Sequence, residues 1–176
     1  MTRIKMMRSG KLPERSIIIM PWEKKNRMNK LNFLVINGPN LNLLGIREPD
    51  IYGKMTYPAL CSYIEKQANQ FGIDTTFFQS NHEGAIIDKI HEAYHKNDGI
   101  IINAGAYTHY SYAILDALKA VEIPTAEVHI SDINSRESFR SISVIRPACC
   151  VCISGRGYEG YVDAIKELAE QIQNHQ

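Results

Sequence analysis

Short apolar runs alternate with amphipathic stretches from residue 32 to the C-terminus. The apolar runs lie at 33–36, 74–78, 99–102, 125–128 and 148–153, and Gly, Pro or polar residues bound them as they bound buried strands. The other stretches, at 56–71, 83–95, 110–121 and 158–172, repeat apolar residues at helical spacing. This alternation predicts an α/β protein whose parallel sheet is covered by helices on both faces.

The length of the chain narrows the choice of architecture. A closed eight-stranded barrel needs more than these 176 residues, so we expect a flavodoxin-like fold with strand order 2-1-3-4-5. Residues 29–176 are predicted to form this single domain. Residues 1–28 are rich in Lys, Arg and Met and lack a clear period, so we expect a disordered or loosely docked extension.

Charge and cysteine content limit the partners. A formal net charge of +1 gives no electrostatic reason to bind nucleic acid, and no apolar run is long enough for a membrane span. Three of the four cysteines, Cys149, Cys150 and Cys152, have neither disulfide nor zinc-site spacing. We interpret them as small residues that fill a buried strand in a reducing cytoplasm, and we expect no metal.

Polar residues follow four of the predicted strands, in the segments 37–40, 79–84, 103–109 and 129–132. The carboxyl ends of parallel strands meet at one edge of a sheet, so these segments predict a polar pocket there. The chain has no P-loop, no G-x-G-x-x-G and no G-x-S-x-G motif. The remaining amides, hydroxyls, histidines and arginines suit a polyhydroxylated ligand with one carboxylate, and proton transfer without a cofactor.

One loop carries the residue pair best suited to that proton transfer. It spans residues 37–53, NGPNLNLLGIREPDIYG, and places Arg47 five positions before Tyr52. A nearby guanidinium favours the charged phenolate form of a tyrosine. A phenolate in that position can act as a general base toward a carbon acid.

Four motifs in this order resemble the type II 3-dehydroquinate dehydratases. They are NGPNLNLLGIREPDIYG, NHEGAIIDKIHEA, NAGAYTHYSYAILDAL and EVHISDINSRESFR, and the resemblance runs from about residue 31 to the C-terminus. It implies a flavodoxin-like subunit that reversibly converts 3-dehydroquinate to 3-dehydroshikimate through an enolate, in the shikimate pathway to aromatic amino acids. It also implies a homo-oligomer, a dodecamer built from trimers, that needs no cofactor, metal or Schiff-base lysine.

The resemblance also implies a role for each matching residue. Tyr52 matches the general base that takes a proton from the carbon beside the ketone, and Arg47 matches the cation that keeps it ionised. His129 matches the general acid for the departing hydroxyl, Glu127 orients or charges that imidazole, and Asn40 helps position a water. The implied substrate contacts are Asn103, His109, Asp116, Arg140 and the backbone amides of Ile130 and Ser131, with Arg136 in support.

Each of these residues has an ordinary explanation when taken alone. Tyr52 could be a packed loop aromatic, Arg47 a solvated charge and His129 a satisfied core histidine. Two other functions also fit the fold, a non-enzymatic scaffold or ligand binder and a flavin or nucleotide binder. The first loop argues against the last of these, because it lacks the Ser, Thr and Gly run that cradles phosphate. The chain departs from the common family pattern at Asp132 and Asn134, close to the expected carboxylate cradle.

Overall fold

A single parallel sheet forms the centre of the molecule. The structure is a computed structural model that describes residues 30–46, 54–135 and 141–174. The strands in these ranges are β1 (Asn32–Asn37), β2 (Asp74–Gln79), β3 (Gly99–Asn103), β4 (Thr125–His129) and β5 (Val151–Ser154). Every neighbouring pair is parallel, in the order β2-β1-β3-β4-β5, which confirms the predicted fold class. The predicted extension at residues 1–28 lies outside the described residues.

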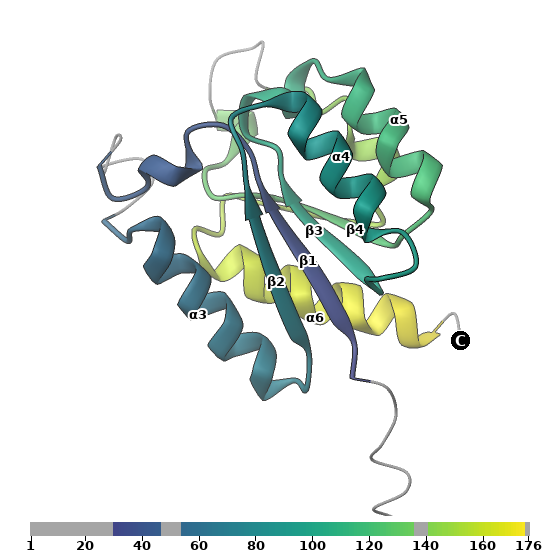
Figure 1. Ribbon diagram of the computed structural model, residues 1–176. Coiled ribbons are helices and arrows are strands. Elements are labelled where there is room, and N and C mark those ends of the chain that lie inside the picture. The colour runs from purple at the N-terminus through teal and green to yellow at the C-terminus, as the bar shows by residue number, and fades with distance from the viewer. Residues whose placement is uncertain (1–29, 47–53, 136–140, 175–176) are drawn as a thin grey trace, which may run out of the picture.

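Helices cover both faces of the sheet (Figure 1). They are α3 (Tyr57–Gln70), α4 (Glu83–Ala93), α5 (Tyr112–Val121) and α6 (Glu159–Asn174). Successive strand residues point to opposite faces, so Phe33 and Val35 pack in the core under α3 and α6. Leu34 and Ile36 pack in the second core, under α4 and α5. The central strands are therefore buried on both sides, which explains why β1 and β3 read as continuous apolar runs, whereas the edge strand β2 is only partly buried.

Side-chain caps set the beginnings of two helices. The Thr56 hydroxyl accepts a hydrogen bond from Ala59 N at 3.4 Å at the start of α3. The Ser111 hydroxyl accepts one from Ile114 N at 3.0 Å, so α5 begins at Tyr112 and not at residue 110 as predicted. The residues just before it form the 3-10 helix η2 (Gly105–His109), which carries two of the site side chains described below.

The last strand is shorter than predicted. Residues Arg146–Ala148 form the 3-10 helix η5 around Pro147, so β5 starts only at Val151. Cys149 and Cys150 precede the strand, Cys150 is exposed, and Cys152 is half-buried within it. Our interpretation of these thiols as fillers of a buried strand is therefore wrong for the first two, because β5 is an edge strand that begins after a turn.

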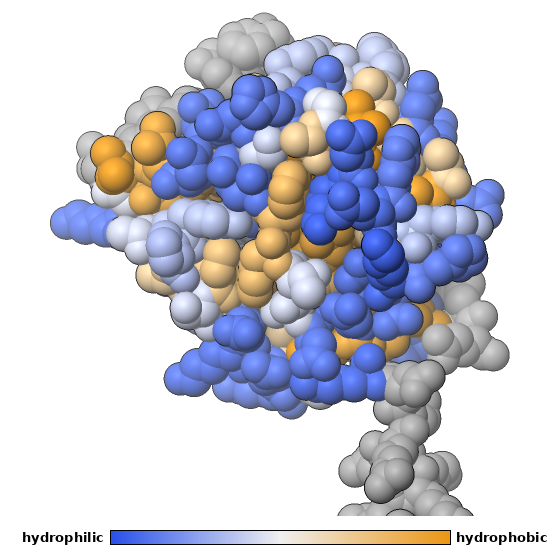
Figure 2. Space-filling model, in the orientation of Figure 1, coloured by the Kyte–Doolittle hydropathy of each residue, from blue (hydrophilic) through white to orange (hydrophobic). Residues whose placement is uncertain are grey.

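One face of the molecule is largely polar. On the face drawn in Figure 2, hydrophilic residues predominate and apolar residues form separate patches. Within the described ranges, no helix combines the length and the apolar character needed to cross a membrane.

A close backbone contact fixes the position of the first strand end. Gly38 N donates to the Asn103 carbonyl at 2.8 Å. A Cβ atom at Gly38 would lie only 2.4 Å from the Ala104 carbonyl oxygen, so glycine alone fits between β1 and β3 at this point. This contact brings the two polar segments after β1 and β3 together.

Candidate active site

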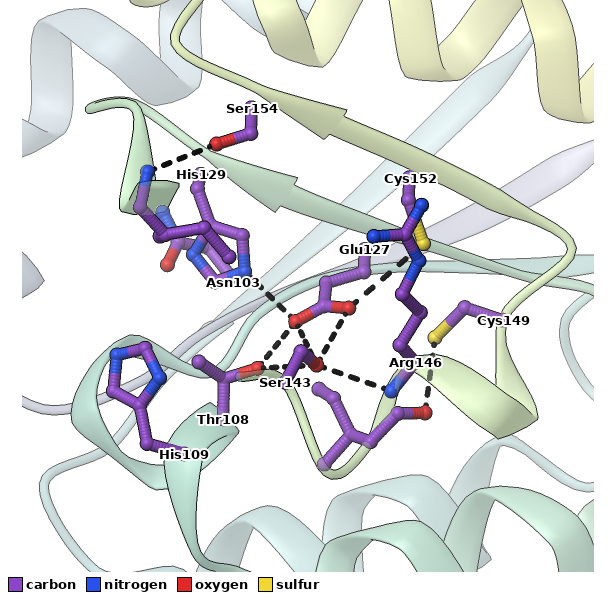
Figure 3. Close-up of polar contacts among 12 residues, drawn as sticks. Asn103, Thr108, His109, Glu127, His129, Ser143, Arg146, Cys149, Cys152 and Ser154 are labelled. Atoms are coloured by element: carbon purple, nitrogen blue, oxygen red, sulfur yellow. Dashed lines mark hydrogen bonds and ion pairs between the residues drawn. The ribbon is translucent and has the colours of Figure 1, made fainter. Parts of the chain in front are cut away.

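The carboxyl ends of four strands bring polar side chains to one edge of the sheet. In the ladder, Asn37 at the end of β1 pairs with Asn103 at the end of β3, and His129 at the end of β4 pairs with Ser154 of β5. Figure 3 shows His109, Glu127 and His129 near this edge together with Asn103. The structure therefore brings together four of the side chains that the sequence predicted for the site.

His129 and Glu127 form a buried pair. His129 Nε2 lies 2.7 Å from Glu127 Oε1, and the two residues are only 7% and 2% exposed. Both side chains point to the same face of β4, because side chains two positions apart on a strand do so. With Nε2 directed at the carboxylate, Nδ1 is the ring nitrogen that remains for another partner.

Three further side chains contact the Glu127 carboxylate (Figure 3). Ser143 Oγ lies 2.8 Å from Oε1 and 2.9 Å from Oε2, and the Thr108 hydroxyl donates to Oε1. Cys152 Sγ lies 3.8 Å from Oε2. Burial acts to raise the pKa of Glu127, but the hydrogen bond and charge of His129, with the two hydroxyls, hold it below its ordinary value. Glu127 is therefore an anion at neutral pH.

The segment that follows residue 140 attaches to η2. Val144 N donates to the Thr108 carbonyl at 2.8 Å, and His109 Nδ1 lies 2.8 Å from the Ile142 carbonyl. A carbonyl only accepts, so Nδ1 of His109 carries the hydrogen and Nε2 is the ring nitrogen left for a ligand. The segment thus holds His109 in one orientation and one tautomer.

The carbonyls at the turn after β4 bond to the segment that follows β5. The carbonyls of His129 and Ile130 accept hydrogen bonds from Gly155 N at 3.2 Å and Gly157 N at 3.0 Å. A peptide unit is planar and trans, so the N–H groups of Ile130 and Ser131 point away from those two glycines. Two adjacent amides on one side of a turn form a concave site for a carboxylate.

Asn103 belongs to a buried chain of hydrogen bonds. Its Oδ1 accepts from Gly105 N at 3.2 Å, and its Nδ2 donates to the Tyr161 hydroxyl at 3.1 Å. The Tyr161 hydroxyl in turn donates to Asn37 Oδ1 at 2.6 Å. Burial raises the pKa of Tyr161, so this phenol stays a neutral donor. The second N–H of Asn103 Nδ2 takes no part in this chain of hydrogen bonds.

Two further predicted residues lie within the described ranges. Asn40 has a left-handed backbone, with φ of 67°, and its N–H donates to Asn81 Oδ1 at 2.9 Å. Asp116 is exposed on α5. The other predicted site residues, Arg47, Tyr52, Arg136 and Arg140, lie outside the described residues.

Sequence reasoning missed three supporting side chains. Thr108 lies inside a quoted motif, but nothing in the local pattern distinguishes its buried hydroxyl from a surface one. Ser143 and Tyr161 come from segments that the motifs do not cover, and only the fold brings them to the strand ends. Within residues 30–46, 54–135 and 141–174, no three His, Cys, Asp or Glu side chains are arranged to hold a metal ion.

Comparisons with known proteins agree on one family. Residues 31–169 match the family model described as dehydroquinase class II. A protein of Caldicellulosiruptor saccharolyticus named 3-dehydroquinate dehydratase is 64% identical over 138 residues, which is 78% of this chain and 95% of that protein. A Clostridium perfringens protein of the same name is 55% identical over 145 residues, 82% of this chain and 99% of the relative.

Solved structures show the same likeness. The type II dehydroquinase from Butyrivibrio crossotus superposes with a TM-score of 0.77 at 56% identity, covering 79% of this chain and 97% of that one. The type II dehydroquinase from Propionibacterium acnes gives a TM-score of 0.76 at 40% identity, covering 79% and 96%. The chain is thus similar to these proteins across almost their whole length.

Proposed function

This chain belongs to the dehydroquinase class II family, and on that premise we propose how its own residues carry out the family's reaction. It is a 3-dehydroquinate dehydratase, a cofactor-independent hydro-lyase that removes water from 3-dehydroquinate to give 3-dehydroshikimate in the shikimate pathway. The observation that most supports the residue roles is the buried His129–Glu127 pair at the carboxyl edge of the sheet.

Tyr52 acts as the general base. A carbon acid beside a ketone is weak, so the base must be strong and yet deprotonated near neutral pH. A phenol with an ordinary titration near 10 is mostly protonated at pH 7. Arg47, five residues earlier, supplies the positive charge that favours the phenolate. The proton moves from carbon to the phenolate oxygen, and an enolate forms.

His129 then protonates the departing hydroxyl. Its Nε2 is directed at Glu127, so the proton it gives up leaves from Nδ1. Both ring nitrogens carry hydrogen in the acid form of the imidazole, and the anionic carboxylate of Glu127 stabilises that positive charge. Water leaves as the enolate collapses to the conjugated product.

The remaining residues bind and orient the substrate. The amides of Ile130 and Ser131, together with Arg140, hold its carboxylate, since the turn after β4 points both N–H groups to one side. The free hydrogen-bonding groups of Asn103 and His109 contact its hydroxyls. Asp116 is a further substrate contact, Asn40 positions a water against the enolate, and Arg136 supports the site.

The active form is a homo-oligomer, and we infer a dodecamer built from trimers, in the cytoplasm. Apolar side chains near the site are exposed in the single chain, with Tyr110 at 59%, Tyr112 at 65% and Ile142 at 64%. Asp116, one helical turn beyond Tyr112 on α5, faces outward with them. A neighbouring copy that covers this surface would bring Asp116 into a second subunit's reach.

An absorbance assay tests this function directly. Dehydration creates a conjugated enone carboxylate, so ultraviolet absorbance is expected to grow when 3-dehydroquinate is added to metal-free protein. Borohydride added with substrate is expected to leave the activity intact, because no imine forms on a lysine. A folded protein without turnover would favour the non-enzymatic scaffold, and inactivation by borohydride would indicate a Schiff-base mechanism.

A further inference from the structure

Ser143 connects several parts of the site although it belongs to no helix or strand. Its hydroxyl contacts both oxygens of Glu127, lies 3.0 Å from Thr108 Oγ1 and accepts a hydrogen bond from Arg146 N at 3.1 Å. It follows Ile142, whose carbonyl binds His109. One hydroxyl therefore joins the segment that holds His109 to the carboxylate that pairs with His129.

The number of available hydrogens defines the direction of each bond. Arg146 N–H donates to Ser143 Oγ, so the serine hydrogen is free to point at the carboxylate. The Thr108 hydroxyl donates to Oε1, which also faces His129 Nε2, and the Ser143 hydroxyl lies 2.8 Å from Oε1 and 2.9 Å from Oε2 as a donor to the carboxylate. Both carboxylate oxygens of Glu127 therefore accept hydrogen bonds. Protonation of this carboxylate would add an O–H donor that has no clear acceptor.

We propose that Ser143 and Thr108 are positioning residues for the dehydration, holding Glu127 as an ionised acceptor with Oε1 aimed at His129. Neither hydroxyl touches the substrate. Each acts through Glu127, which in turn orients and charges the acid His129. The inference rests on the proposed roles of His129 and Glu127.

The other titratable and charged groups around Glu127 are compatible with this role. Burial, and then the charge of Glu127, raise the pKa of Cys152 to about 11, so this thiol stays neutral and its S–H is a weak donor to Oε2. The same two causes raise the pKa of Cys149. Arg146, whose side chain is exposed, supplies a positive charge that acts on both thiols. The buried donors of the carboxylate are therefore the imidazole and the two hydroxyls.

Single substitutions test the proposal in the full-length oligomer. Ser143→Ala and Thr108→Val each remove one donor to the carboxylate, and each is expected to lower kcat by about ten- to a hundredfold with KM changed less than threefold. The carboxylate loses a stabilising donor, so the acid limb of the kcat–pH profile is expected to move to higher pH by roughly one unit. Ser143→Thr and Thr108→Ser retain the hydroxyl and are expected to recover most of the rate. Ser62→Ala, on the exposed side of α3, is the matched control and is expected to leave kcat and the acid limb of the pH profile unchanged.

The pH profile separates positioning from a purely structural role. Variants that lose thermal stability but keep the wild-type kcat and acid limb would overturn the proposal. If Ser143→Ala does not fold, Thr108→Val, which is isosteric, applies the same test against Thr108→Ser. Failure of the proposed function gives a different result. In that case the wild-type protein would show no turnover of 3-dehydroquinate, or the His129→Ala protein would retain the wild-type turnover.

Discussion

His129 Nε2 lies 2.7 Å from Oε1 of Glu127, two residues earlier on the same strand. This spacing places both side chains on one face of β4 without help from any loop. The pair is nearly inaccessible to solvent, so its attraction is screened far less than that of a surface ion pair. The acid of the proposed mechanism is thus positioned by the sheet.

Replacing the proposed base should abolish turnover and spare the fold. Tyr52→Phe removes only the hydroxyl, and we expect kcat to fall by at least roughly a hundred- to ten-thousandfold, the usual contribution of a general base. Circular dichroism and thermal unfolding are expected to match the wild type. A Tyr52→Phe protein with near wild-type kcat would remove Tyr52 from this role.

Replacing the loop cation should act on the rate through Tyr52. We expect Arg47→Ala to lower kcat by at least about tenfold, because the phenolate loses the positive charge that favours it. Arg47→Lys keeps a cation and is expected to retain more activity, although it lacks the planar guanidinium. The stabilities of both variants should remain close to the wild type, and equal kcat values for all three proteins would refute the pairing.

The contribution of Glu127 to stability should depend on pH. Its pKa is lowered in the folded protein, so the unfolded chain binds more protons as pH falls. The stabilisation is therefore fully present above the unfolded pKa of a glutamate and is lost as pH falls through the lower folded value. We expect the difference in unfolding free energy between the wild type and Glu127→Gln to shrink between pH 7 and pH 3. Denaturant titrations of both proteins at one protein concentration measure this difference. A difference in unfolding free energy that stays constant with pH would contradict the prediction.

Tyr161 should matter for stability through its hydroxyl alone. Tyr161→Phe leaves Asn37 Oδ1 without its donor and Asn103 Nδ2 without its acceptor, both in the buried end of the sheet. We expect a loss of about 1–3 kcal/mol in unfolding free energy. Tyr94→Phe, at a site 52% exposed, is the matched control and should change stability by less than about 0.5 kcal/mol. Equal losses of unfolding free energy in Tyr161→Phe and Tyr94→Phe would show that the buried hydrogen bonds of Tyr161 contribute nothing to stability.

Two glycines should respond to alanine in opposite directions. At Gly38 a new Cβ would meet the Ala104 carbonyl oxygen at 2.4 Å, so Gly38→Ala is expected to cost about 1–3 kcal/mol as the strand ends move apart. At Gly84, in the first turn of α4, nothing lies within 4 Å of the Cβ position. Gly84→Ala is expected to stabilise the protein by about 0.5–1 kcal/mol. Thermal or denaturant unfolding measures both, and a stable Gly38→Ala protein would contradict the close contact.

Much of the fold was predictable because its signals are local. The central strands β1 and β3 read as apolar because helices cover both of their faces. Thr56 caps the start of α3, and Gly72, with a positive φ of 70°, marks its end. The His129–Glu127 pair was also local, since two-residue spacing on a strand decides it. The predicted starts of α5 and β5 were wrong, because Ser111 caps α5 and Pro147 belongs to a 3-10 helix ahead of β5.

The amino-acid sequence by itself determined the elements, their order and the residue types at the strand ends. Only the tertiary structure decided which side chains support the residues at the strand ends, because the supporting side chains are distant from them along the chain. Asn37 meets Tyr161 across 124 residues, and Glu127 meets Ser143 across 16. The hydrophobic periodicity of the sequence does not predict such contacts, because they arise only when crossover connections bring separate segments to the same edge of the sheet.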